Sequence, residues 1–182
     1  MTEFTLDIEN IRQQARAKVE EGAVTASYQA DREKVLHLLD AALATEWLCV
    51  LRYTQHSIAA EGIHSESVAK HFASHASQEQ EHANQLANRI KQLGGNPDLS
   101  PESFSKRGHS DYKECDSLEE MIRENLIAER IAIQSYTQMI RYIGESDPTT
   151  RRLLESILET EEEHADEMAD LLSNFDHREK LN

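Results

Sequence analysis

The sequence predicts an all-α protein built as a four-helix bundle, with one long crossover connection and an extra N-terminal helix. Three observations support this fold class. The 182 residues include only three Pro and six Gly, so several long runs contain neither. Four of these runs repeat apolar residues at intervals of three and four, the period of a helix with one buried face. A single long polar connection, residues 94–116, separates the second run from the third.

The chain divides into an N-terminal extension, the bundle and a C-terminal tail, which we expect at residues 1–30, 31–176 and 177–182. In the extension, Asp7 can cap a short helix in which apolar residues recur at helical spacing until Gly22. Because such a helix has one apolar face, it must pack against its own bundle or against a neighbouring subunit. The sequence leaves both open.

The first bundle helix is expected between Asp31 and Glu61, with Gly62 as its stop. Its inward-facing positions are Leu36, Leu39, Leu43, Glu46, Val50 and Tyr53. Glu46 therefore stands where a bundle seam normally has a leucine. A carboxylate buried without a partner costs several kcal/mol, so Glu46 must be neutralised or bound to a cation.

The second helix is expected from Ser65 to Leu93, where the sequence Gly-Gly-Asn-Pro breaks it. Its inward-facing positions are Val68, Phe72, His75, Glu79, His82, Leu86 and Ile90. The short link to the first helix predicts an antiparallel pair. The 23 residues at 94–116 show no clear periodicity, and when extended they can span a helix of about 30 Å. We therefore expect the third helix to run parallel to the second.

The third helix opens with Ser117-Leu-Glu-Glu120, a capping box, and Gly144 closes it. Its inward-facing positions are Ile122, Leu126, Glu129, Ile133, Tyr136, Ile140 and Ile143. The fourth helix begins at Asp147-Pro148, an N-cap followed by Pro at the first helical position. Its inward-facing positions are Leu154, Ile157, Glu161, His164, Met168, Leu171 and Phe175. The two halves of the chain thus repeat the same layout of polar residues.

Two Glu-x-x-His motifs interrupt the apolar seams of the second and fourth helices. The ionisable seam residues are Glu46, Glu79, His82, Glu129, Glu161 and His164. Residues three apart on a helix share a face, so each motif can offer both side chains to one metal ion. A lone Glu precedes each motif by 32 or 33 residues, at the same depth of the neighbouring helix. Two single Glu residues with two Glu-x-x-His motifs form the ligand set of dinuclear carboxylate bundles.

We expect Glu79 and Glu161 to bridge two metal ions. Glu46 and His82 would complete the ligands of one ion, and Glu129 and His164 those of the other. Carboxylate and imidazole ligands suit iron or manganese, and zinc could also bind. The alternative is a metal-free centre in which the buried carboxylates form salt bridges.

Four other residues near the expected ligands could have either a functional or a structural role. Tyr53 is either a core aromatic residue or a hydrogen-bond partner and one-electron donor at the site. Cys49, one turn from Glu46, is either a small buried residue or a thiol beside an oxidising centre. A disulfide from Cys49 to Cys115 would require the crossover to fold back. His75 lies on the inner face one turn before the first motif.

The charge and the absence of targeting signals narrow the function classes. With 34 acidic and 19 basic residues, the formal net charge is −15, which argues against a nucleic-acid partner and suits attraction of cations. No apolar run reaches the ~18–20 residues of a membrane span. The N-terminus lacks the basic start and apolar stretch of a secretory signal. We expect a cytoplasmic protein with no membrane partner.

The chain resembles the bacterioferritins and their relatives in the ferritin-like superfamily over about residues 31–175. The resemblance rests on Glu46 with Tyr53, Glu79-Gln-Glu-His82, Leu126-Ile-Ala-Glu129 and Glu161-Glu-Glu-His164. It implies a ferritin-like four-helix bundle with two iron ions per subunit, which oxidises Fe(II) with H2O2 or O2. The implied roles are iron storage, detoxification and protection from oxidative stress inside a hollow homo-oligomer. Gln80 replaces the haem-ligating Met of bacterioferritins, so haem is not expected.

The long N-terminal extension and the two cysteines are more similar to the Dps-like branch that carries a bacterioferritin-type site, the thioferritins. That resemblance implies a 12-subunit cage, with 24 subunits as the alternative. Manganese catalases and rubrerythrins have a similar set of carboxylate and histidine ligands. A dinuclear oxidoreductase that stores no iron is therefore an alternative function. Rubrerythrins usually add a four-cysteine iron site, whereas this chain has two Cys. A metal-free bundle used for interaction is the third alternative.

Overall fold

The computed structural model describes residues 5–62 and 65–179, with side chains described as far as residue 174. All regular secondary structure in these residues is helical, and they contain no strand. The elements are α1 (Ile8–Gln14), the 3-10 helix η1 (Val19–Glu21), α2 (Arg32–Ala59), α3 (Ser65–Gln92), α4 (Pro101–Arg107), α5 (Leu118–Ile143) and α6 (Pro148–Glu179). The all-α fold class is confirmed.

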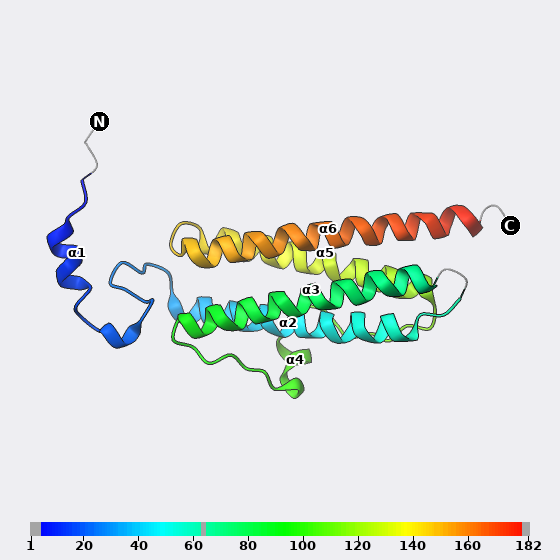
Figure 1. Ribbon diagram of the computed structural model, residues 1–182, viewed down its shortest axis with the longest axis horizontal. Coiled ribbons are helices and arrows are strands. Elements are labelled where there is room, and N and C mark those ends of the chain that lie inside the picture. Colours follow the sequence, from blue (N-terminus) through cyan, green and yellow to red (C-terminus); the bar gives the residue numbers. More distant parts are fainter. Residues whose placement is uncertain (1–4, 63–64, 180–182) are drawn as a thin grey trace.

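The four long helices α2, α3, α5 and α6 lie side by side as a bundle (Figure 1). They pack most extensively as two antiparallel pairs, α2 with α3 and α5 with α6. The connection between α3 and α5 returns along α2 to the opposite end of the bundle, so α5 runs parallel to α3 (Figure 1). The single-crossover topology predicted from the length of the connection is therefore confirmed.

The N-caps predicted for the third and fourth bundle helices are confirmed, and Asp31, the expected start of the first, is an N-cap as well. A side-chain oxygen of each cap accepts a hydrogen bond from the backbone N–H three residues further on, at Asp31 (3.2 Å), Ser117 (3.2 Å) and Asp147 (2.9 Å). Each bond satisfies one of the backbone donors that a helix leaves free at its N-terminus. The sequence therefore fixes where these helices begin.

The helix ends differ more from expectation. α2 ends at Ala59 with Ala60 as its C-cap, two residues before Glu61. α6 continues to Glu179, beyond the expected end at 176, because no Gly or Pro follows Pro148 to stop it. The rest of the expected tail, residues 180–182, lies outside the described residues. α1 ends at Gln14 instead of continuing toward Gly22, and it buries none of its residues. Without tertiary packing, a longer helix there is not stabilised.

The inner face is predicted well for α3 and less well for α5. All seven expected positions of α3 are buried, from Val68 to Ile90. In α5, Leu126, Ile133 and Ile140 are only partly buried, and the fully buried residues stand one position earlier, at Asn125, Ala132 and Met139. The buried face of α5 is wider than a single seam, and its centre is occupied partly by small or polar residues.

The helix α4 is a feature that the sequence analysis missed, because seven residues are too short to show a periodicity. It begins with Pro101, and its Phe104 is 5% exposed and packs on Trp47 with ring centroids 6.3 Å apart. A Cβ added to Gly108, just after α4, would lie 2.5 Å from Leu48 Cδ1. A larger residue at position 108 would require Leu48 to move. Because α4 covers its outer side, α2 is buried on two faces.

The end of the crossover is held by a buried arginine. Arg52 in α2 is 1% exposed, and its Nε donates to Asn125 Oδ1 of α5 at 2.9 Å. Its Nη1 donates to the carbonyl of Asp111 in the crossover at 3.1 Å. His56 Nε2 lies 2.9 Å from the carbonyl of Lys113. These bonds fix the crossover against α2 and α5, so that α5 starts at a defined depth.

In the described part of the chain, no helix is long and apolar enough to cross a membrane.

Replacement of Phe104 by Ala tests whether α4 stabilises the bundle. The substitution leaves a cavity beside Trp47, so we expect the free energy of unfolding to fall by about 3–4 kcal/mol. Urea denaturation of the metal-free protein, followed by far-UV circular dichroism, measures this change. Leu99→Ala in the same crossover is the control, because Leu99 is 51% exposed and should change stability by less than about 0.5 kcal/mol. Equal effects of the two substitutions would contradict this role of α4.

Candidate metal centre

The six residues predicted as metal ligands meet at mid-length of the bundle. They come from all four long helices, one Glu each from α2 and α5 and a Glu-x-x-His motif each from α3 and α6. All are buried, with exposed fractions of 1% for Glu46, 0% for Glu79, 6% for His82, 0% for Glu129, 1% for Glu161 and 2% for His164. Four carboxylates and two imidazoles are thus gathered in one chain, away from water.

The ligand atoms form two overlapping groups. In each group, the four atoms lie within 4.8 Å of one another, close enough to hold one metal ion. The groups are Glu46, Glu79, His82 and Glu161, and Glu79, Glu129, Glu161 and His164. Both contain Glu79 and Glu161, the two residues expected to bridge. The geometry therefore suits two adjacent ions with two shared carboxylates.

His82 lies among three carboxylates. Its Nδ1 is 3.1 Å from Glu161 Oε1, 3.3 Å from Glu46 Oε2 and 3.4 Å from Glu79 Oε2. Two ligand atoms bound tetrahedrally to one metal at ~2.0–2.1 Å are separated by about 3.3 Å. The spacing around His82 therefore matches a coordination shell.

His164 occupies the corresponding place in the second group. Its Nδ1 lies 3.1 Å from Glu79 Oε1 and 4.0 Å from Glu129 Oε2. Its Nε2 lies 3.1 Å from Oε1 of the exposed Gln78. The ring is thus held by a buried carboxylate on one side and a surface amide on the other, which orients it toward the carboxylates.

Four carboxylate oxygens at the centre accept no hydrogen bond. They are Oε2 of Glu79, Oε2 of Glu129 and both oxygens of Glu161, none with a hydrogen-bond partner among the described residues. Three of the four still lie within 4.0 Å of a histidine nitrogen, in ion-pair contact with His82 or His164. Buried polar atoms are usually satisfied, so a cluster of unsatisfied acceptors is unusual. A bound cation would satisfy all four, and two His and four Glu suit iron, manganese or zinc. The donor set therefore fits a dinuclear metal site.

In the metal-free protein, the pKa values of the four carboxylates are shifted in different directions. Burial and the neighbouring charge of Glu79 raise the pKa of Glu46 to about 8. The same two causes raise the pKa of Glu129 and place that of Glu161 well above its usual value. Burial also acts to raise the pKa of Glu79, but hydrogen bonds from His164 and His82 outweigh it and lower that pKa. Without metal, the centre is neutralised largely by bound protons.

The two histidines contribute to this neutralisation. Burial opposes a charge on His82, yet its hydrogen bonds to Glu46 and Glu79 raise its pKa to about 10. Hydrogen bonding to Glu79 likewise overcomes burial and raises the pKa of His164. Metal ions bind the deprotonated forms of these side chains, so metal binding must release protons from the centre.

Two tyrosines connect the halves of the centre in a crossed arrangement. Tyr53 of α2 donates a hydrogen bond to Glu129 Oε1 of α5, and Tyr136 of α5 donates one to Glu46 Oε1 of α2. Burial, followed by the carboxylate charge, raises the pKa of both phenols well above normal, so both remain protonated donors. The seam pattern alone does not distinguish Tyr136 from an ordinary core residue. The shared spacing reveals it, because each Tyr follows its helix's lone Glu by seven residues.

His75 and the cysteines lie beside the centre. His75 is 2% exposed, its Nδ1 lies 3.2 Å from the Tyr53 hydroxyl, and it belongs to neither four-residue group. Cys49 and Cys115 are free thiols. Cys115, at the end of the crossover, packs against the apolar cluster that contains Cys49. A function for the thiols remains a prediction.

Comparison with known proteins agrees with this fold. The ferritin-like domain model matches residues 36–177. A DNA protection during starvation protein of Pyrococcus furiosus is 30% identical over 146 residues, 79% of this chain and 79% of that protein. A bacterioferritin of Desulfovibrio desulfuricans is 28% identical over 141 residues, 76% of this chain and 75% of that protein.

A similar solved structure is that of a bacterioferritin-related protein from Bacteroides fragilis, described as a dodecameric thioferritin. Its TM-score is 0.80 at 28% identity, and the match covers 84% of this chain and 92% of that one. The all-helical bundle with its carboxylate and histidine centre and these matches define the class of protein. The chain belongs to the ferritin-like family. The resemblance to bacterioferritins and thioferritins found in the motifs is thereby confirmed.

The pKa shifts predict how the stability of the metal-free protein depends on pH. The folded-state pKa of Glu46, about 8, and that of His82, about 10, both lie above the values of an unfolded chain. The folded protein therefore holds protons that the unfolded chain has lost, and stability falls as pH rises through this range. With a chelator present, we expect Tm to drop by several degrees between pH 6 and pH 9.

Thermal unfolding of metal-free protein across this pH range provides the measurement. Glu46→Gln removes one of the titrating groups and should flatten the decline, whereas the exposed neighbour Glu81, replaced by Gln, should leave it unchanged. Saturating Zn(II) should also flatten it, because metal replaces the protons. If the Tm of the wild-type protein with chelator rises from pH 6 to pH 9, the folded centre does not hold the extra protons that we expect.

Proposed function

We propose that this protein is a ferroxidase, which oxidises Fe(II) with H2O2 or O2 at a dinuclear site within each subunit. Glu46, Glu79, His82, Glu129, Glu161 and His164 are the proposed metal ligands. The purpose would be iron storage and detoxification, with protection from oxidative stress, in a hollow homo-oligomer. Two irons per subunit are proposed, manganese or zinc could occupy the same ligands, and haem has no part.

The observation that carries this proposal is the pair of four-ligand groups that share Glu79 and Glu161 within one chain. His82 and His164 lie in ion-pair contact with the four carboxylates, but two histidines cannot balance four carboxylates, and four oxygens have no hydrogen-bond partner among the described residues. Removing repulsion among buried carboxylates would make a bundle more stable. The retention of all four therefore favours a function that needs them.

The chemistry requires two one-electron donors held close together. One H2O2 accepts one electron from each of two Fe(II) ions, its O–O bond breaks, and two protons complete two water molecules. The shared carboxylates keep the two ions adjacent, so the electrons are delivered as a pair. Tyr53 and Tyr136 orient Glu129 and Glu46 through their hydrogen bonds. The proposed further role of Tyr53, next to His75, is to replace one Fe(II) as electron donor: it gives one electron and its hydroxyl proton, and a further Fe(II) with a proton from solvent reduces the resulting radical.

The assembly is proposed by analogy with the relatives. The related Bacteroides fragilis protein is described as dodecameric, so 12 subunits are proposed, with 24 as the alternative. A cytoplasmic location remains a prediction. The Pyrococcus furiosus relative carries a DNA-protection name, but the formal net charge of −15 opposes contact of this chain with nucleic acid. DNA binding is therefore not part of the proposed function.

Iron loading tests the proposed function directly. We expect protein supplied with Fe(II) and H2O2 to elute as a large oligomer that holds far more than two irons per chain, while the added H2O2 disappears. Size-exclusion chromatography with light scattering and iron analysis measures the mass and the loading. Glu129→Gln should abolish loading, and the exposed Glu162→Gln on α6 is the matched control. A small oligomer limited to two metals per chain would exclude storage and favour a catalase-like or peroxidase-like dinuclear enzyme.

Comparison of Tyr53→Phe with Tyr136→Phe tests the role of Tyr53. Each substitution removes one buried hydrogen bond to a proposed ligand, and Tyr53→Phe also removes the contact of the hydroxyl with His75 Nδ1. If Tyr53 also takes part in the reaction, Tyr53→Phe should slow Fe(II) oxidation roughly tenfold more than Tyr136→Phe. Stopped-flow absorbance of Fe(III) formation, at equal metal content per chain, measures both rates. Equal rates would assign Tyr53 a purely structural role.

A further inference from the structure

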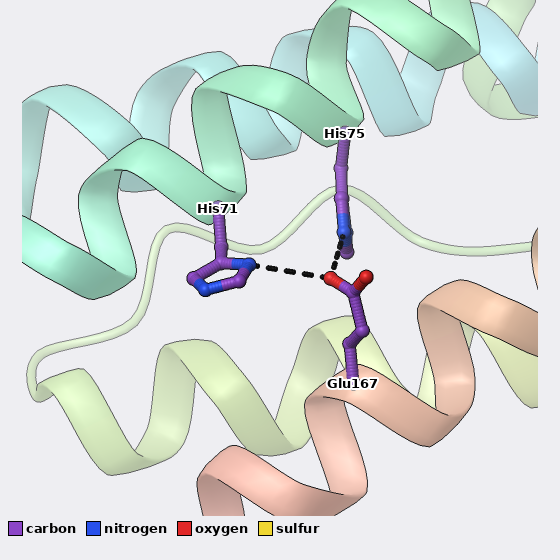
Figure 2. Close-up of side chains that lie close together, drawn as sticks. All are labelled: His71, His75 and Glu167. Atoms are coloured by element: carbon purple, nitrogen blue, oxygen red, sulfur yellow. Dashed lines mark hydrogen bonds and ion pairs between the residues drawn. The ribbon is translucent and has the colours of Figure 1, made fainter.

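A third cluster of ligand side chains lies beside the dinuclear centre but outside it. His71 and His75 of α3 face Glu167 of α6 (Figure 2). His71 Nδ1 is 3.2 Å from Glu167 Oε2, and His75 Nε2 is 2.9 Å from the same oxygen. The three ligand atoms lie within 4.8 Å of one another. None of these residues belongs to the four-ligand groups of the dinuclear centre.

The sequence spacing of this cluster is suited to chelation. His71 and His75 are four residues apart on α3, so both rings project from one face, as in helical His-x-x-x-His zinc sites. Glu167 reaches them from α6, and a metal ion held by all three would link the two helices. Two ligands of a tetrahedral ion with bonds of ~2.0–2.1 Å are separated by about 3.3 Å, close to the two N–O distances observed.

The cluster runs from the surface to the buried centre. The side chains of His71 and Glu167 are 46% and 50% exposed, whereas that of His75 is 3% exposed. The His75 ring stacks on His164, a proposed ligand, with centroids 3.9 Å apart and planes 17° apart. A cation bound by the outer pair would therefore lie one ring away from the dinuclear ligands.

We propose that His71, His75 and Glu167 form a third site for a divalent first-row cation, through which Fe(II) reaches the dinuclear centre. Cation binding at the cluster stands on its own geometry, and the transit role rests on the proposed ferroxidase function. Exposed His71 and Glu167 capture the ion from solution. His75 contacts both Glu167 and the His164 ring, so it transfers the ion from the outer pair to the dinuclear centre.

Titration of metal-free protein with Co(II) tests the site, because the visible absorption of Co(II) reports each bound ion and its coordination. We expect three Co(II) per chain in the wild type. His71→Ala and Glu167→Gln should each weaken the third ion by at least tenfold, since loss of even an outer-shell partner costs about 10–100-fold in affinity. His37→Ala and Glu163→Gln are matched controls, an exposed His and a Glu one turn before Glu167, and should still bind three.

A double variant that lacks the dinuclear centre allows the third site to be measured alone. Glu46→Gln with Glu129→Gln disables the centre, so one Co(II) per chain should remain and should disappear on addition of His71→Ala. Two ions in both the wild type and His71→Ala would overturn the third site and leave the dinuclear proposal standing. One ion in the wild type, lost in His71→Ala, would support the third site and overturn the dinuclear centre.

The transit role is measured by the initial rate of Fe(II) oxidation at limiting iron. We expect His71→Ala to lower this rate at least threefold and to approach the wild-type rate at saturating iron, because only delivery is impaired. His37→Ala should match the wild type at both concentrations. An unchanged rate at limiting iron in His71→Ala would overturn the transit role, whatever the Co(II) titration shows.

Discussion

The mutual repulsion of four buried carboxylates is the constraint around which this structure is arranged. Each exposes at most 1% of its surface, and in the metal-free centre bound protons reduce the repulsion in place of cations. Glu79 keeps its charge because two histidines donate to it, and that charge raises the pKa of the other three. The centre is therefore an electrostatic unit in which each group sets the ionisation of its neighbours. A fold that carries such a unit must compensate for its cost elsewhere.

That compensation comes from apolar clusters on both sides of the centre. One cluster, which includes Leu39, Leu86 and Ile157, lies toward one end of the bundle, and another, which includes Phe72 and Ile122, lies toward the other. Burial of large side chains contributes roughly 1.5–3 kcal/mol each. The polar layer is thus enclosed between two layers of ordinary core. The crossed Tyr–Glu bonds join the two helical hairpins within the polar layer itself.

The bundle and its centre were predictable because both rest on local periodicity. A Glu or His at a seam position is visible in the sequence, and N-caps such as Asp147 mark helix starts by local chemistry. Arg52 and α4 were not predictable, because their roles depend on partners 59 or more residues away or on packing of a seven-residue helix. The same limit applies to Tyr136, whose seam position predicts only a core residue. Its contact with Glu46 spans 90 residues, and only the pseudo-symmetry of the chain reveals it.

The enclosure also determines where a cation can reach the centre. The apolar clusters block both ends of the bundle, and the antiparallel pairs α2 with α3 and α5 with α6 pack extensively. α3 with α6 and α2 with α5 pack less extensively. Arg52 and the crossover cover the seam between α2 and α5, whereas the polar contacts of Gln78 with His164 and of His75 with Glu167 lie along the seam between α3 and α6. Passage of an ion along this seam exchanges one set of polar ligands for another without crossing apolar core. Access between α3 and α6 is therefore the route that the packing leaves least costly.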